Sequence, residues 1–470
     1  MSRALAAALA IALVSVLLVE PAPSYDPWAW LLWGREVAGG SLSTLAGPAF
    51  KPLPVAVCAL LAPVDSAAPW LWVALVRMAA LLAAWLAYGL GRRLADGSRL
   101  AGALAATSVV LCGGLPYYAA TGAEPALVLA LGLGGAAAWR ERRFRVALAC
   151  TVCCALLRVE AWPFALAAGI ALWRGRPQDR ALLAALALAV PAAWLVPELV
   201  GSGDLLRSGA RARVPNPGQP ALERIPGLAA LRAAVALPLW PLWAGVAALL
   251  ARAALLPRRG GASDALRARA LLLPAGGGAS DELRTRAALA PAAAGAAWIA
   301  IVALMAQAGF SGEPRYALPG AALIAVSGAS GLVLAARATP RGPALALAAL
   351  AALVALAAAP RLGDLPSLRA AQAHQWRLAG ELDTAIRAAG GRDAVLACGR
   401  PFVGRLRGPL MAYRMRVAKH VVEPDAAPRA PGVVFRSALA RASAPAPAAG
   451  PGFVEVARTD RWQVLADCRT

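Results

Sequence analysis

The sequence predicts an all-α polytopic membrane protein, with about eleven transmembrane helices and a small C-terminal α/β domain outside the cytoplasm. Of its 470 residues 60% are hydrophobic, and the mean hydropathy is +0.61. Its few charged residues, 15% of the chain, gather between apolar runs. Runs of about 17–25 apolar residues suit a helix that crosses a hydrocarbon core of roughly 30 Å. Because the pattern changes after residue 359, we expect a multispan domain over 1–359 and an α/β domain over 360–470.

Eleven apolar runs are interpreted as membrane spans. They cover 4–19, 70–90, 100–115, 125–139, 146–157, 161–173, 181–200, 228–251, 287–308, 317–336 and 343–359. The stretch 146–173 is too long for one span, and Arg158 and Glu160 lie in its middle, where a lipid-exposed helix tolerates charge poorly. It is therefore predicted to form two short helices that meet at an Arg–Glu turn.

The loop charges predict the orientation of the spans. Segments assigned to the cytoplasm hold 20 lysines and arginines in 65 residues, whereas the outer segments hold 8 in 97. This is the asymmetry of the positive-inside rule. It predicts a multi-pass protein of the plasma membrane with a cytoplasmic N-terminus and an extracytoplasmic C-terminal domain. It also explains the net charge of +22 without nucleic acid as a partner.

The tail after residue 359 is predicted to combine one amphipathic helix with short strands. The helix covers 366–389, and the strands cover 393–398, 431–435, 453–457 and 462–468. Cys398 and Cys468 each end a predicted strand. Since an outer compartment permits oxidation, we expect a disulfide between them.

Two other features are assigned no chemistry. A local repeat pairs 260–275 with 277–292, at the expected cytoplasmic face. The cysteines at 150–154 lie in an apolar run without histidine or carboxylate nearby, and they are interpreted as buried small side chains. The sequence shows no P-loop, dinucleotide fingerprint or metal cluster, so neither a cofactor nor a metal is expected.

Most charged or aromatic polar residues beside the spans gather at the expected outer face. They are Tyr25, Asp26, Arg35, Glu36, Lys51, Tyr117, Tyr118, Glu124, Arg158, Glu160, Glu313, Arg315 and Tyr316. Guanidinium and ammonium groups stabilise phosphate oxygens, and a carboxylate can serve as a general base. This combination suits a site that binds a lipid-linked phosphate while it activates a hydroxyl.

Four short segments carry a resemblance to a known superfamily. They read SYDPWAWLLWGREVAGG…GPAFKPLPV after the first span, then GAEP, LLRVEAWPF and PRYALPG. Together with the topology, over roughly residues 1–340, they resemble the GT-C glycosyltransferases of the protein-mannosyltransferase and lipid-A aminoarabinose-transferase type, and most of all their actinobacterial members. The resemblance implies a membrane enzyme that uses a polyprenyl-phosphate sugar.

The resemblance also implies roles for single residues. Asp26 matches the acid that activates the acceptor, and Glu124 falls where a second acid often lies. The residues expected at the donor phosphate are Lys51, Arg158, Arg315 and Tyr316, and those expected to support the site are Tyr25 and Glu160. Two departures leave the acceptor class open: Pro27 and Trp28 follow Asp26 in place of a second acid, and the turn reads Arg-Val-Glu where relatives often have Arg-Pro-Glu.

Each of these residues also has a structural interpretation. Asp26 could cap a helix, and Glu124 could be a first-turn acid favoured by the helix dipole. Arg158 and Glu160 could form a structural ion pair, and Arg315 could extend to lipid headgroups. The tryptophans are interpreted as an interfacial belt. They are Trp28, Trp30, Trp33, Trp70 and Trp72.

The leading hypothesis is an inverting glycosyltransferase that moves a sugar from a polyprenyl-phosphate donor to an acceptor hydroxyl at the outer face. Its expected partners are this donor, a glycan, lipid or protein acceptor, and membrane lipids. One alternative is a non-catalytic polyprenyl-lipid binding protein or translocase of the cell envelope. Another is a structural envelope protein that presents the 360–470 domain to a partner.

Overall fold

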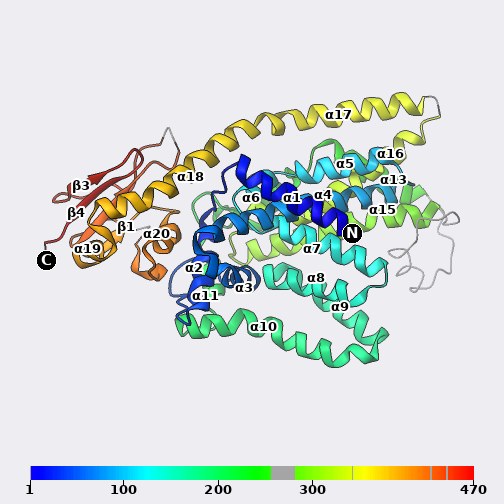
Figure 1. Cartoon of the computed structure of the whole chain (residues 1–470). Helices are drawn as coiled ribbons and strands as arrows, with labels where there is room; N and C mark the ends of the chain where they lie inside the picture. The colour runs from blue at the N-terminus through cyan, green and yellow to red at the C-terminus, as the bar shows by residue number, and fades with distance from the viewer. Residues whose placement is uncertain (1, 256–280, 341, 424–425, 441–442, 470) are drawn as a thin grey trace.

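The computed structural model describes residues 2–255, 281–340, 342–423, 426–440 and 443–469. They form an elongated helical bundle with a small α/β domain at one end (Figure 1). The helices of the bundle are α1 (Ser2–Leu18), α2 (Tyr25–Ala38), α3 (Pro52–Leu61), α4 (Ala68–Leu94), α5 (Arg99–Val110), α6 (Leu115–Ala120), α7 (Pro125–Arg140), α8 (Phe144–Leu157), α9 (Trp162–Gly175), α10 (Arg180–Ser202), α11 (Arg207–Ala212), α12 (Pro226–Val235), α13 (Pro241–Leu255), α15 (Asp281–Gln307), α16 (Pro314–Arg337) and α17 (Pro343–Gly363). The first copy of the repeat, 260–275, lies outside the described residues.

The apolar runs fold into helices as their composition predicts. Nine of the eleven runs each coincide with one helix, including the two short helices α8 and α9 on either side of Arg158 and Glu160; the run 100–115 forms α5 and extends to the first residue of α6. Within the described ranges, five helical stretches are long and apolar enough to cross a membrane. They are 52–94, 177–202, 281–307, 314–337 and 343–388.

The prediction of one uninterrupted helix over 228–251 was wrong. The chain forms α12 and α13 instead, and the break between them contains Pro238. Proline has no N–H and its ring clashes with the preceding turn, so it ends a helix. Arg361 of α17 compensates for the break, because its guanidinium donates hydrogen bonds to the carbonyls of Leu237 at 2.6 Å and Pro238 at 3.1 Å.

Helix α16 is the central helix of the bundle. Most of its residues between 317 and 331 are buried, and α4, α5, α13 and α15 pack around it. Small residues make this possible: a Cβ added at Gly328 would lie 2.4 Å from the carbonyl oxygen of Leu242, and one at Gly320 2.5 Å from that of Gly295. Close backbone approach at small residues is typical of helix packing in membranes. The packing places the first turn of α16, with Arg315 and Tyr316, at one end of the bundle.

The C-terminal domain consists of α18 (Leu365–Ala388), α19 (Gly391–Cys398), α20 (Gly408–Met415) and a four-stranded sheet. The sheet has the order β1 (Arg400–Phe402), β2 (Gly432–Arg436), β4 (Gln463–Asp467) and β3 (Val454–Arg458), with β1 parallel to β2 and the other pairs antiparallel. Trp462 joins the layers, because its indole donates a hydrogen bond of 2.8 Å to the carbonyl of Leu378 in α18.

The helix expected over 366–389 and the strands expected over 431–435, 453–457 and 462–468 are present, but the strand expected over 393–398 was wrong. This segment forms α19, which buries Val395. A short apolar run cannot be assigned to strand or helix by periodicity alone. A disulfide joins Cys398, at the end of α19, to Cys468, with Cα atoms 4.7 Å apart.

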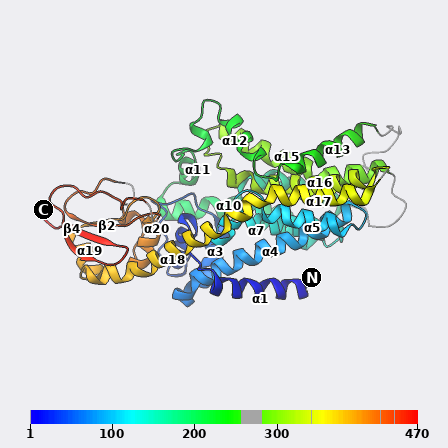
Figure 2. The ribbon, with the colours of Figure 1, turned by 90° about the horizontal axis from the view of Figure 1, so that it is seen from above.

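The C-terminal domain packs on α2, at the end of the bundle where α3 and α11 also lie (Figures 1 and 2). Tyr413 of α20 makes several of these contacts. Its ring lies 5.3 Å from that of Trp28 and 4.4 Å from the guanidinium of Arg35, and its hydroxyl donates a hydrogen bond to the carbonyl of Asp65. The domain therefore holds α2 against the bundle.

The charge asymmetry of the loops gives a testable orientation. A cysteine introduced in place of Ala444, exposed in the C-terminal domain, should react with an impermeant thiol reagent in intact cells. A cysteine in place of Thr339, exposed in the turn after α16, should react only after permeabilisation. The parent chain, with its native thiols, is the control. The reverse labelling pattern would contradict the assigned orientation.

Candidate functional site

Helix α2 carries Asp26 at its first turn. The N-cap of the helix is Ser24, so Asp26 is not the capping residue. Pro27, the next residue, is tolerated in the first turn because the amide it lacks would have no partner there. The side chain of Asp26 is largely buried, and α2 lies between the bundle and α20.

The tryptophans do not form an interfacial belt, and this prediction was wrong. Trp28, Trp30, Trp33 and Trp72 are all buried, and the rings of Trp30 and Trp72 meet edge to face at 5.6 Å. Trp70 packs against Trp376 of α18. A belt residue would expose its ring to lipid, whereas these rings fill the space that α2 and the C-terminal domain cover.

Two clusters of charged side chains meet at the first turn of α16. In the first, Nη2 of Arg315 lies 3.0 Å from Oδ2 of Asp26, and Nε lies 2.5 Å from Oε2 of Glu313. Glu313 also accepts a hydrogen bond from the side chain of Gln219. Arg315 is therefore held between two carboxylates, with most of its side chain buried.

The second cluster of charged side chains is almost completely buried. Arg158 donates two hydrogen bonds to Glu160, with Nε 3.0 Å from Oε2 and Nη2 in contact with Oε1. Its Nη1 lies 3.1 Å from Oε1 of Glu124, and the ammonium of Lys51 lies 2.5 Å from the same oxygen. Burial alone would raise the pKa of Glu124. The positive charges of Lys51, Arg315 and Arg158 lower it by a larger amount, so the pKa lies well below its usual range.

Tyr316 contacts both clusters of charged side chains. The guanidinium carbon of Arg158 lies 3.7 Å from the centre of its ring, and Nη2 of Arg315 donates a hydrogen bond of 3.3 Å to its hydroxyl. A cation over an aromatic face is favourable, and more so where water is excluded. The side chains of α2, the 51 loop, α7, the 158–160 turn and α16 thus form one continuous cluster.

A cleft of about 110 Å³ opens onto this cluster. Five residues predicted from the sequence line it, namely Tyr25, Asp26, Lys51, Arg315 and Tyr316. The other three, Glu124, Arg158 and Glu160, do not line it, and they lie behind Lys51 and Tyr316 with their charges paired to each other.

The cleft also has residues that were not assigned to the site from the sequence. Arg211 and Asn216 come from the loop that includes α11, and Arg405 comes from the C-terminal domain, where it donates a hydrogen bond of 3.0 Å to Asn216. Glu313 also lines the cleft; it was counted among the charged residues of the outer face but was given no role in the site. Nothing in the sequence connects Arg405 with residue 26, because only the docking of the domain brings them together.

The loop that carries Lys51 is held from outside by α10 and α11. Arg207 donates hydrogen bonds to the carbonyls of Gly47 and Pro48, at 2.9 and 2.8 Å. Ser208 accepts one of 2.6 Å from the amide of Phe50, and both Arg207 and Ser208 contact the buried Glu198 of α10. These contacts fix the backbone just before Lys51.

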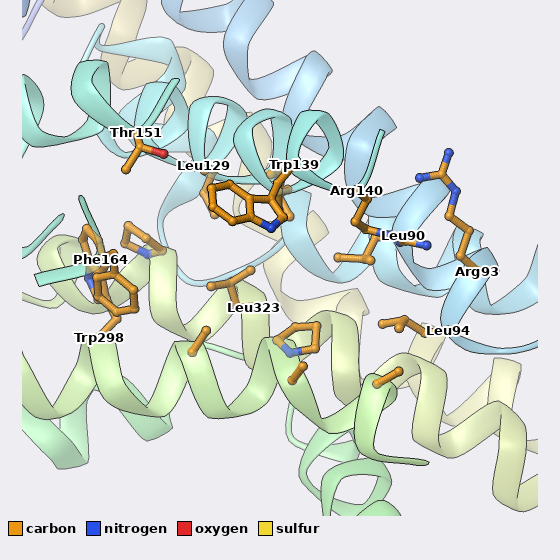
Figure 3. A pocket seen from close by; sticks show the side chains of 18 of the residues that line it. Leu90, Arg93, Leu94, Leu129, Trp139, Arg140, Thr151, Phe164, Trp298 and Leu323 are labelled. Carbon is orange, nitrogen blue, oxygen red and sulfur yellow. The ribbon is translucent and has the colours of Figure 1, made fainter. Parts of the chain in front are cut away.

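An apolar groove of about 780 Å³ runs between α4, α7, α8, α9, α15 and α16 (Figure 3). One end of the groove lies beside the charged cluster, because the indole of Trp298, which lines the groove, donates a hydrogen bond of 2.7 Å to the backbone carbonyl of Tyr316. Phe164 packs against Trp298 there, with ring centres 5.7 Å apart. Within the described ranges, no three His, Cys, Asp or Glu side chains lie close enough to hold a metal ion.

No protein-family model and no curated protein matches the chain. Two solved structures are similar along nearly its whole length. ArnT from Cupriavidus metallidurans in the apo state is 15% identical with a TM-score of 0.52, covering 98% of this chain and 98% of that one. The same protein bound to undecaprenyl phosphate is 15% identical with a TM-score of 0.49, covering 99% and 97%. The chain therefore has the fold of ArnT, which confirms the predicted multihelical fold with a small C-terminal α/β domain.

Proposed function

We propose that the chain is a membrane glycosyltransferase that moves a sugar from a polyprenyl phosphate to an acceptor hydroxyl, on the side of the membrane where the C-terminal domain lies. One observation carries this proposal. Asp26, a candidate base, shares a cleft with Lys51 and Arg315, and an apolar groove ends beside the same cluster. The fold shared with ArnT supports it, and so does the resemblance of four sequence segments to GT-C glycosyltransferases.

The donor would bind with its phosphate at the cations and its chain at the groove. Lys51 and Arg315 supply an ammonium and a guanidinium, and both groups stabilise phosphate oxygens. The first isoprene units would then contact Phe164 and Trp298. This arrangement keeps the sugar, which is joined to the phosphate, near Asp26.

The reaction would then proceed by a single displacement with inversion. Asp26 takes the proton of the acceptor hydroxyl while the oxygen of that hydroxyl attacks the anomeric carbon. The bond from that carbon to the phosphate oxygen breaks, and the polyprenyl phosphate leaves with the bonding electrons. Lys51 and Arg315 stabilise the negative charge that develops on it.

In this proposal the buried charged side chains orient the residues that contact the donor phosphate. Glu124 positions Lys51 and Arg158 through its Oε1, and Arg158 supports the ring of Tyr316 from behind. Glu160 holds Arg158 in turn through two hydrogen bonds. Tyr25 lines the cleft next to Asp26.

The purified protein should transfer sugar from a polyprenyl-phosphate sugar to an acceptor glycan, lipid or peptide, with release of polyprenyl phosphate. Release that depends on acceptor distinguishes an enzyme from a protein that only binds or moves the carrier. Lipid transport between leaflets without any sugar transfer would contradict the proposal and favour a translocase.

Arg315→Lys should lower turnover by about tenfold or more, because a single ammonium cannot reproduce the hydrogen bonds of a guanidinium to charged partners. The variant keeps the charge, so it should still insert and fold. Arg224→Lys, at an exposed residue of the loop before α12, is the matched control and should behave as the parent protein does. Normal donor binding and turnover in Arg315→Lys would exclude Arg315 from phosphate binding.

A further inference from the structure

Three arginines converge on the end of the apolar groove that lies away from the C-terminal domain. Arg93 is in the last turn of α4, Arg140 ends α7, and Arg284 is in the first turn of α15. All three line the groove, together with one acid, Asp96, which lies 3.6 Å from Arg284. Figure 3 shows Arg93 and Arg140 close together at this end, with Phe164 and Trp298 at the other.

Arginines at helix ends on the cytoplasmic side follow from the positive-inside rule alone. These three differ because helices that are distant in the sequence bring them to one cavity. Among the described residues that line this end, three carry guanidinium groups and one carries a carboxylate, so the lining has an excess of positive charge. It is a basic pocket between transmembrane helices.

The groove between its two ends is lined mainly by apolar side chains, including Leu129, Leu133 and Leu323. Such a lining favours a hydrocarbon chain, and it disfavours passage of a charged headgroup, which would lose its hydration without gaining partners. The chemistry of the whole feature is therefore that of a phosphate attached to an aliphatic chain.

We propose that this end of the groove binds an anionic glycerophospholipid. Its phosphate lies among Arg93, Arg140 and Arg284, and one acyl chain extends into the groove. Guanidinium groups bind phosphate through paired hydrogen bonds, and basic pockets between helices on the cytoplasmic side hold anionic headgroups. The site is separate from the cleft at Asp26, and it would serve a lipid-binding protein as well as an enzyme, so it does not rest on the proposed function.

The test is a lipid titration of the full-length, delipidated protein, followed by native mass spectrometry. Phosphatidylglycerol and phosphatidylcholine with identical chains are compared. We expect the first to bind at least about tenfold more tightly, and the paired substitution Arg93→Gln with Arg140→Gln to remove that preference, since each cation near the headgroup contributes appreciably. Binding of phosphatidylcholine should not change.

Two neighbouring arginines provide matched controls. Arg92 stacks on Tyr88 and Arg286 pairs with Glu282, and neither lines the groove. Arg92→Gln and Arg286→Gln should therefore keep the preference for phosphatidylglycerol. An equal loss in these controls would show that only general surface charge acts, and it would overturn the site.

A second measurement does not depend on how the glutamine variants fold. Phosphatidylglycerol with a photoreactive group in its acyl chain should label peptides of α7 and α16 in the unaltered protein. Arg93→Lys with Arg140→Lys should retain this labelling, because the charges remain. Equal affinity for the two lipids, or labelling confined to the outer faces of α1 and α10, would refute the proposal.

Discussion

Replacing Asp26 by Asn should reduce sugar transfer by at least about a hundredfold, because general-base catalysis contributes roughly 10²–10⁴ in rate. The amide has the same size and can still accept a hydrogen bond from Arg315, which lies 3.0 Å from the carboxylate. It cannot take a proton from an acceptor hydroxyl. Insertion, folding and donor binding should therefore persist while turnover is lost. The measurement is the rate of acceptor-dependent release of polyprenyl phosphate by the purified variant.

The comparison with Asp26→Ala separates catalysis from structure. If Asp26 mainly stabilises the start of α2 or the fold around Arg315, the Asn variant should be nearly normal and only the Ala variant should be damaged. Because Ser24 and not Asp26 is the N-cap, we expect both variants to lose turnover and the Asn variant to keep its thermal stability. Near wild-type transfer in Asp26→Asn would remove this residue from the mechanism.

Replacing Glu124 by Gln should destabilise the protein by about 3–5 kcal/mol, the range found when one partner of a buried ion pair is removed. Glu124 is 1% exposed, and a single oxygen contacts both Lys51 and Arg158. Without its charge, two buried cations face each other with only Glu160 to balance them. We also expect weaker donor binding, because Lys51 loses the group that orients it. Unfolding in mixed micelles and donor titration measure the two effects.

The pH dependence of this effect has a defined sign. The pKa of Glu124 is lowered in the folded protein, so its contribution to the free energy of unfolding is complete above the unfolded-state value of about 4.3 and is lost as the pH falls further. The difference between the parent chain and Glu124→Gln should therefore shrink in acid. Glu223→Gln, at an exposed residue, should show no difference at any pH.

A double-mutant cycle tests whether Lys51 and Glu124 act together. Lys51→Met should also destabilise the protein, because it leaves the carboxylate with one cation fewer. The double variant should cost less than the sum of the two single variants, since residues in direct contact are coupled. Strict additivity would show that the 2.5 Å contact contributes nothing to folding.

The tryptophans show where reasoning from sequence reaches its limit. Five of them lie close to apolar runs, as interfacial residues do, and the sequence alone cannot distinguish a ring that faces lipid from one that a neighbouring domain covers. The structure buries Trp28 against Tyr413, which is 385 positions later. The segment 393–398 presents a similar ambiguity, because six residues are too few to distinguish a strand from two turns of helix.

Local composition along the chain is sufficient to locate the apolar helices and the charged residues beside them. The length of an apolar run decides whether a helix can cross the hydrocarbon core, and the charge of each loop biases its orientation. Both properties can be evaluated one segment at a time. Which of these charged residues contact one another depends on the packing of the helices and the docking of the C-terminal domain. Lys51 contacts Glu124, Asp26 contacts Arg315, and Arg405 reaches the same cleft from another domain. These contacts depend on how α16 packs among its neighbours and on where the C-terminal domain docks, which no local pattern encodes.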